Sequence, residues 1–128
     1  MIYLAGSIHG LTLTEANDWR ERAKETLSPL RVINPLDFEF DGRTHPPAEI
    51  IKTDLEAIDD ATEVLVDLRA ASWGTAMEIM YAHGLGTPVI GWGSDGNISP
   101  WVRHHVGRIY FTLHDAVREM HRAHYHGL

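Results

Sequence analysis

Residues 63–83 read EVLVDLRAASWGTAMEIMYAH, and this stretch decides the fold. It begins with consecutive apolar residues, Val64 to Val66, as expected for a strand that is covered on both faces. The segment from Ser72 to His83 then reads as a short apolar helix. A buried strand followed by a helix is the repeating unit of a parallel sheet with crossover helices, so the stretch predicts an α/β protein.

The same alternation continues on both sides of this unit. Thr12-x-x-Glu15 is a capping-box pattern that opens a helix, and Pro47 suits the first turn of another. Strands are expected at residues 2–5, 31–33, 63–68, 88–92 and 108–111, and helices at 12–27, 47–61, 72–84, 99–105 and 112–124. Residues 34–46 form a loop rich in Pro, Asp and Gly.

Five strands joined by helices predict a flavodoxin-like three-layer sandwich. The sheet is parallel, in the order 2-1-3-4-5, with helices on both faces. Residues 1–128 have the size of one domain, and no repeat or linker divides them. Ligands of such sheets bind beyond the carboxyl ends of the strands, near the switch point between strands one and three. Candidate site segments are therefore residues 6–10, 69–78 and 93–103.

Composition narrows the functional classes. The formal charge is −7, with 18 acidic residues against 11 Lys plus Arg, which argues against a protein that coats DNA or RNA. No apolar run is long enough to span a bilayer, and the N-terminus lacks the positive start of a signal peptide, so we expect a cytoplasmic protein without membrane attachment. There is no cysteine, and the histidine spacing near the C-terminus matches no strong zinc pattern. No metal or other cofactor is expected.

Glu78 is the formally charged residue of an otherwise uncharged stretch between Arg69 and Asp95. A carboxylate in an apolar helix is costly to bury unless it is paired, and burial raises its pKa in a way that a catalytic site can use. The alternative is that Glu78 points outward or caps a neighbouring element.

A second acid, Asp54, lies beside the apolar stripe of Ile51, Leu55 and Ile58 on the helix from Pro47. An acid next to a buried stripe breaks the local pattern, and such exceptions concentrate at functional sites; the alternative is a solvated edge position. Two carboxylates that face one pocket are the minimal equipment for cleaving a glycosidic bond.

Three motifs follow one another in a specific order. They are Tyr3-Leu4-Ala5-Gly6-Ser7-Ile8-His9-Gly10, Asp54-Leu55-Glu56-x-x-x-Asp60-Ala61 and Ser72-x-Gly74-Thr75-Ala76-x-Glu78-x-x-x-Ala82. Together they resemble the nucleoside 2-deoxyribosyltransferase family, which includes the 2′-deoxynucleoside 5′-monophosphate N-glycosidases. The resemblance extends from Ile2 to about Arg103.

The resemblance implies a role for each matching residue. Glu78 matches the nucleophile that attacks C1′ and forms a deoxyribosyl ester. Asp54 matches the acid that assists departure of the base, and Tyr3 matches the tyrosine that orients the nucleophile. The implied substrate-binding residues are Gly6, Ser7, Ile8, His9, Gly10, Ser72 and Gly74, together with Ser99 of the partner subunit. A homodimer or higher homo-oligomer is implied in the same way.

The residue at position 72 bears on whether the substrate is a nucleoside or a nucleoside 5′-monophosphate. In the family, nucleoside-using transferases tend to carry an acid there, whereas monophosphate glycosidases tend to carry a serine. Ser72 therefore favours hydrolysis of a deoxynucleoside 5′-monophosphate to free base and deoxyribose 5-phosphate. One departure is His9, which stands where the glycosidase loop usually has an arginine, and whose charge depends on pH.

Two alternatives stay open. One is a transferase that exchanges bases between deoxynucleosides, since the same glycosyl–enzyme can react with water or with another base. The other is a nucleotide-binding or sensing module that keeps the fold without the chemistry. Retention of Glu78, Asp54 and Tyr3 together favours the enzyme.

Overall fold

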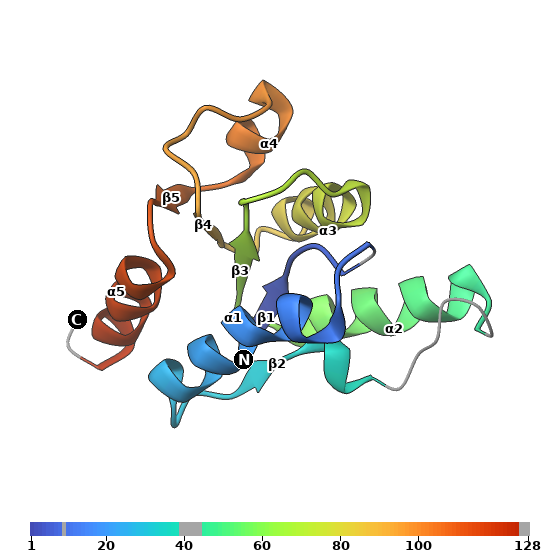
Figure 1. Cartoon of the computed structure of the whole chain (residues 1–128), viewed down its shortest axis with the longest axis horizontal. Coiled ribbons are helices and arrows are strands. Elements are labelled where there is room, and N and C mark those ends of the chain that lie inside the picture. Colours follow the sequence, from blue (N-terminus) through green and yellow to red (C-terminus); the bar gives the residue numbers. More distant parts are fainter. Residues whose placement is uncertain (9, 39–44, 126–128) are drawn as a thin grey trace.

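A five-stranded parallel sheet in the order β2-β1-β3-β4-β5 forms the centre of the molecule, with helices on both sides (Figure 1). The computed structural model describes residues 1–8, 10–38 and 45–125. The strands are β1 (Ile2–Ala5), β2 (Val32–Ile33), β3 (Glu63–Asp67), β4 (Val89–Trp92) and β5 (Arg108–Tyr110). The helices are α1 (Leu13–Leu27), the 3-10 helix η1 (Pro35–Asp37), α2 (Pro47–Asp60), α3 (Trp73–Gly84), α4 (Pro100–His105) and α5 (Leu113–Tyr125). The flavodoxin-like fold and its strand order are therefore as predicted.

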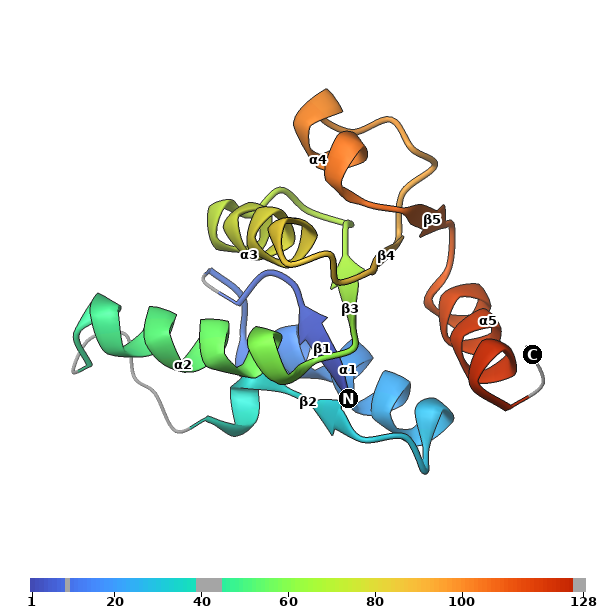
Figure 2. The ribbon, with the colours of Figure 1, turned by 180° about the vertical axis from the view of Figure 1, so that it is seen from behind.

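The sheet separates two hydrophobic cores. On one face, Ile2 and Leu4 of β1 belong to a cluster with side chains of α1 and α5. On the other face, Tyr3 and Ala5 belong to a cluster with side chains of α2 and α3. Figure 2 shows from behind how α2 and α3 flank the central strands, with α4 beyond α3. This division follows from the two-residue period of a strand, which sends alternate side chains to opposite faces.

The alternation decides where Tyr3 points. Tyr3 pairs in register with Val64 of β3, and both side chains lie in the core that α2 and α3 cover. Tyr3 therefore meets the two helices that carry the candidate acids. The helix that follows β3 carries Glu78, so neighbouring strands bring residues 3 and 78 to the same layer.

Side chains cap the N-termini of α1 and α3. Thr12 and Glu15 form the predicted capping box at the start of α1. Ser72 caps α3 by accepting a hydrogen bond of 3.3 Å from the amide of Thr75. Such caps satisfy orphan amides of the first turn. In the described part of the chain, no helix combines the length and apolarity that crossing a membrane requires.

Two details differ from the sequence-based prediction. The loop after β2 contains η1, which Asn34 caps by accepting a hydrogen bond of 3.0 Å from the amide of Leu36. Ile51, expected in the buried stripe of α2 with Leu55 and Ile58, is 55% exposed, whereas Ile58 is fully buried. The reason is that the first half of α2 extends past the sheet, so Ile51 borders an open cleft.

Candidate active site

The first turns of α3 and the middle of α2 face each other across a cleft of about 480 Å³. A cleft of this size suits a small organic ligand. It is lined by Gly6, Ile8, Ile50, Ile51, Asp54, Leu55, Ser72, Gly74, Thr75, Met77, Glu78 and Tyr81. Its position beyond the carboxyl ends of β1 and β3 is the switch point where the topology predicts a ligand. Glu78 and Asp54, chosen from separate segments of the sequence, line this one cleft.

Tyr3, on the central strand β1, fixes the carboxylate of Glu78. The tyrosine hydroxyl donates a short hydrogen bond to Oε2 of Glu78, and the tyrosine side chain is fully buried. The pKa of Glu78 is raised to about 7: burial and the charge of Asp54 raise it, whereas the bond from Tyr3 and the positive charge of Arg20 lower it. Burial, together with both acids, moves the pKa of the Tyr3 hydroxyl far above its usual range, so Tyr3 stays a donor.

Asp54 projects from α2 into the same cleft and is partly buried. Burial raises its pKa to about 6. Two carboxyl groups with raised pKa values in one cleft form a pair that holds or shares a proton near neutral pH. Perturbed acids of this kind are typical of catalytic sites. The solvated alternative for Asp54, and the outward-pointing one for Glu78, do not describe the structure.

The loop after β1 forms the end wall of the cleft. Gly6 and Ile8 line it. Ser7 and Gly10 lie in the same loop but are not among the described residues that line the cleft, and His9 lies outside the described residues. The hydroxyl of Ser7 is buried and has no hydrogen-bond partner among the described residues. A buried hydroxyl without a partner is costly, and a bound ligand is one way of satisfying it.

The first turn of α3 supplies a different kind of group. Ser72, Gly74 and Thr75 line the cleft there, and the first turn carries no acidic residue. The first amides of a helix have no intrahelical acceptor, and the helix dipole adds partial positive charge, so this end favours an anion. The cleft thus has a carboxylate half, at Asp54 and Glu78, and an anion-favouring end.

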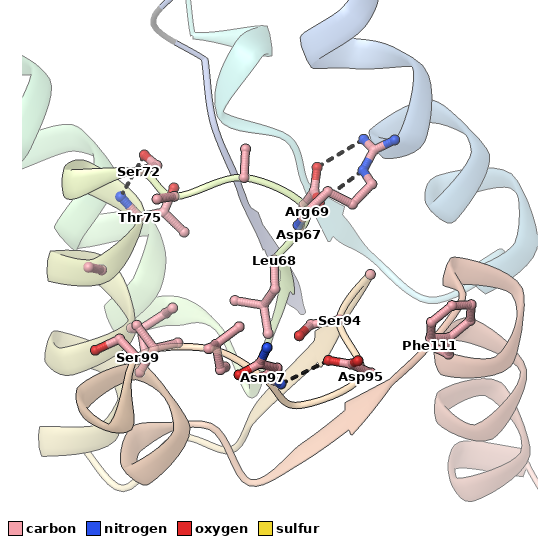
Figure 3. Close-up of a pocket in the computed structure, with 17 residues that line it drawn as sticks. Asp67, Leu68, Arg69, Ser72, Thr75, Ser94, Asp95, Asn97, Ser99 and Phe111 are labelled. Carbon is pink, nitrogen blue, oxygen red and sulfur yellow. Dashed lines mark hydrogen bonds and ion pairs between the residues drawn. The ribbon is translucent and has the colours of Figure 1, made fainter.

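A second cavity, of about 550 Å³, lies on the other side of this turn, between the segments that follow β3 and β4 (Figure 3). Ser99 lines this cavity and caps α4, accepting a hydrogen bond of 3.2 Å from the amide of Trp101. Ser99 does not line the cleft that contains Glu78 in its own chain. Asp67 and Arg69 form a bidentate ion pair at the rim, with N–O distances of 3.0 and 2.9 Å.

Three residues at or behind the cleft were not predicted as site residues from the sequence. Thr75 lines the cleft with a buried hydroxyl that has no partner among the described residues. Tyr81 lines it too, and its hydroxyl donates a 2.6 Å hydrogen bond to Asp59. Both lie three residues from Glu78, and this helical spacing is the signal that identifies them. Arg20, fully buried on α1, occupies a position four residues after the buried Ala16. A charged residue on a buried stripe was detectable by the same periodicity that identified Asp54.

The fold resembles several solved structures. A 2-deoxyribosyltransferase from Bacillus psychrosaccharolyticus superposes with a TM-score of 0.73 at 20% identity, covering 89% of this chain and 88% of that one. A conserved protein from Enterococcus faecalis V583 gives 0.72 at 17%, covering 93% and 95%. A 2-deoxyribosyltransferase from Leishmania mexicana gives 0.56 at 19%, covering 71% and 62%. At these identities the likeness concerns the fold alone.

Sequence comparison supplies the family. No curated protein sequence matches the chain significantly. The family model described as nucleoside 2-deoxyribosyltransferase matches residues 2–120, nearly the whole chain and all three motifs around Tyr3, Asp54 and Glu78. The chain therefore belongs to the nucleoside 2-deoxyribosyltransferase family.

Proposed function

We propose that this protein hydrolyses the N-glycosidic bond of a 2′-deoxynucleoside 5′-monophosphate through a covalent deoxyribosyl–Glu78 intermediate. The observation that carries the proposal is the meeting of Tyr3, Asp54 and Glu78 at one cleft. A binding module for a phosphorylated ligand gains nothing from two acids with raised pKa values, because each acid repels the phosphate. Glycosidic cleavage requires both.

The first step forms one bond and breaks one. Tyr3 holds Oε2 of Glu78, which leaves Oε1 as the oxygen that attacks C1′ of the deoxyribose. As the ester bond forms, the bond from C1′ to the base nitrogen breaks and its electron pair goes to the base. The carboxyl proton of Asp54 goes to the base as it leaves. Deoxyribose lacks the 2′-hydroxyl and forms an oxocarbenium-like transition state readily, so a carboxylate nucleophile suffices.

The second step returns the site to its initial state. A water molecule attacks C1′, Asp54 accepts its proton, and the bond between C1′ and Glu78 breaks with its electrons returning to the carboxylate. The products are free base and deoxyribose 5-phosphate, and neither acid is consumed.

The protonation states of Asp54 and Glu78 that the first step needs arise when the substrate is bound. In the free protein the pKa of Asp54 is raised to about 6 and that of Glu78 to about 7, so both carboxyl groups bind protons near neutral pH. The mechanism needs the proton on Asp54 and the negative charge on Glu78. A base that packs over Asp54 removes water from this carboxyl group and raises its pKa, and the remaining charge of the pair then resides on Glu78.

In this proposal the 5′-phosphate binds at the first turn of α3. Ser72, Gly74 and the orphan amides there favour a dianion, and no acid stands in that turn to repel it. The unpartnered hydroxyl of Ser7 is a further donor of the neighbouring loop. The apolar lining by Ile8, Ile50, Ile51, Leu55 and Met77 is suited to contact with the flat face of a base.

A homo-oligomer completes the site in this proposal. Trp73 and Met77 on α3 and Trp101 on α4 are 87%, 71% and 74% exposed, an unusual set of large apolar side chains in one region. They border a groove of about 560 Å³ between α3 and α4. Ser72 and Met77 line both this groove and the cleft, and Ser99 lines the groove as well. In a symmetric dimer that buries the groove of both copies, we therefore expect the partner's segment around residue 99 to approach the phosphate position.

Base exchange between deoxynucleosides is the second candidate, favoured by the description of the family model. Chromatography of incubations with deoxynucleosides and their 5′-monophosphates, with and without an added free base, separates the candidates. Base release from monophosphates alone supports the proposal, and exchange between nucleosides supports the transferase. Glu78→Gln is the matched control, because it keeps the side-chain shape and removes the nucleophile. Equal activity in Glu78→Gln, or no change in any incubation, contradicts catalysis by Glu78.

A further inference from the structure

Arg20 is a fully buried cation, and among the described residues its hydrogen bonds go to backbone carbonyls. One terminal nitrogen donates to the carbonyl of Ala16 and the other to the carbonyl of Gly6, at 2.9 Å for the latter, while Nε has no partner among the described residues. The guanidinium lies 4.8 Å from the ring centre of Trp19. A buried charge without a paired carboxylate is costly, so its presence needs a compensating charge nearby.

The charged and titratable groups near Arg20 come from three elements. They are Tyr3 on β1, Asp67 at the end of β3 and Glu78 on α3. Asp67 is already neutralised by its bidentate ion pair with Arg69, which also stacks over Trp92 at 4.5 Å. Tyr3 stays protonated. Among the described residues, Glu78 is therefore the remaining acid near Arg20. The other titratable groups that act on Glu78 are Tyr3 and Asp54.

Arg20 also fixes the wall of the cleft. Its bond to the Gly6 carbonyl turns that carbonyl toward α1, and in a trans peptide the following amide, that of Ser7, points to the opposite side. The space at Gly6 is closed, because an added Cβ would lie 3.0 Å from Cζ2 of Trp19 and 3.3 Å from Nη2 of Arg20. The guanidinium thus sits directly behind a peptide that lines the cleft.

We propose that Arg20 is a positioning residue for the nucleophile: its bond to the Gly6 carbonyl holds the cleft wall against which the substrate rests, and its buried guanidinium places a positive charge behind the wall of the cleft that Glu78 lines. The proposal rests on the function proposed above for Glu78. This role of Arg20 gives a reason for a cation at a core position of α1, where an apolar side chain would avoid the cost of burying a charge.

The test compares Arg20→Lys, which keeps the charge, with Arg20→Gln and Arg20→Met, which remove it. Gln retains a donor for the Gly6 carbonyl, and Met retains packing on Trp19. Arg22→Gln is the matched control, since Arg22 lies on the same helix, is exposed and pairs with Asp18. The readouts are the pH profile of kcat/KM and the pKa of Glu78, measured by NMR on protein with 13C-labelled glutamate and assigned with Glu78→Gln.

In Arg20→Gln and Arg20→Met, we expect the acidic limb of the kcat/KM profile to move to higher pH by about one unit or more, together with the NMR pKa of Glu78. Activity at pH 6 should then fall about tenfold relative to activity at pH 8.5. For Arg20→Lys and Arg22→Gln, we expect the acidic limb of the kcat/KM profile to stay at its wild-type pH. A purely structural role lowers activity equally at every pH and leaves the NMR pKa unchanged, which would overturn the proposal. If both neutral variants fail to fold while Arg20→Lys folds, the charge serves the fold and the proposal is also wrong.

The NMR titration separates this proposal from the function on which it rests. If the wild-type protein cleaves no deoxynucleoside or deoxynucleotide, the proposed function fails. The Glu78 pKa in the Arg20 variants still decides whether the guanidinium acts on that carboxyl group.

Discussion

Tyr3 donates a hydrogen bond to Glu78 although 75 positions separate the two residues in the sequence. The contact exists because β1 and β3 are neighbours in the sheet, and because Tyr3 points to the face that α3 covers. It gives the Glu78 carboxylate one fixed donor and opposes the rise in pKa that burial causes. The nucleophile of the proposed reaction is therefore oriented by a fully buried side chain of the central strand.

Tyr3→Phe removes this donor and keeps the ring packing. Because the hydrogen bond favours the ionised carboxylate, we expect the pKa of Glu78 to rise and kcat to fall by roughly 10- to 100-fold. The measurement is the pH profile of kcat/KM, whose acidic limb should move to higher pH. Tyr110→Phe, on β5 and away from the cleft, is the control. A wild-type profile for Tyr3→Phe would show that the bond has no catalytic role.

Asp54→Asn tests the proposed proton donor through the leaving group. An ordinary purine leaves poorly without protonation, so cleavage should fall by roughly 10²- to 10⁴-fold. A 7-methylated purine already carries the positive charge and leaves as a neutral base, so its cleavage should fall by less than about tenfold. Asp60→Asn, an exposed acid on the same helix, is the control. Equal losses for both substrates would place Asp54 outside proton transfer.

Ser72→Asp tests the choice between nucleotide and nucleoside. Aspartate caps a helix as well as serine does, so α3 should be preserved. Its negative charge should repel a 5′-phosphate and lower kcat/KM for monophosphates at least about tenfold, while unphosphorylated deoxynucleosides are unaffected or favoured. Ser72→Ala is the comparison, with a loss of about 1 kcal/mol of stability from the missing cap. Parallel losses for both substrate types would remove Ser72 from phosphate recognition.

Local patterns were enough to predict the fold. The capping box at Thr12, the apolar run of β3 and the regular alternation of strands and helices each reflect a short-range preference that the sequence displays directly. The strand order followed because parallel connections of this kind have few alternatives. The exposure of Ile51 was not predictable, since it depends on how far α2 extends past the sheet.

The candidate site was predictable in part. Asp54 and Glu78 stood out because acids beside apolar stripes are out of pattern, and both line the cleft. The bond between Tyr3 and Glu78, and the place of Arg20 behind Gly6, arise from packing between distant segments. Periodicity marks such residues as buried but does not say what they face, so their partners required the three-dimensional structure.

The proposed oligomer is tested by exposed apolar residues. Trp101→Glu places a charge on the α4 surface, so we expect it to convert the oligomer to monomers in sedimentation velocity experiments. Leu13→Glu, equally exposed at the start of α1, should leave the oligomer intact. A monomeric wild-type protein at all concentrations would contradict the proposal.

Subunit complementation then tests the shared site. Glu78→Gln and Ser99→Ala are each expected to be impaired, but a mixed dimer contains one site with both residues intact. If Ser99 of the partner subunit serves the cleft, mixing equal amounts of the two variants and re-equilibrating them should restore about a quarter of the wild-type activity per site, because half of the dimers are then mixed and each mixed dimer has one intact site. Activity that stays at the sum of the two separate variants would place Ser99 outside the neighbouring cleft.

Stability should depend on pH through the two acids of the cleft. The folded pKa values of Glu78 and Asp54, about 7 and about 6, lie above the ordinary values of unfolded carboxyl groups. Between about pH 4.5 and pH 7 the folded protein therefore binds more protons than the unfolded chain, and the free energy of unfolding decreases as pH rises through this window. Each pKa unit corresponds to about 1.4 kcal/mol of unfolding free energy.

Thermal unfolding from pH 5 to 8.5 measures how the free energy of unfolding changes with pH. Glu78→Gln, which cannot ionise, should flatten it, and because the exposed acids are common to both proteins their contributions cancel in the difference. An identical slope in Glu78→Gln and the wild type would mean that Glu78 has an ordinary pKa in the folded protein.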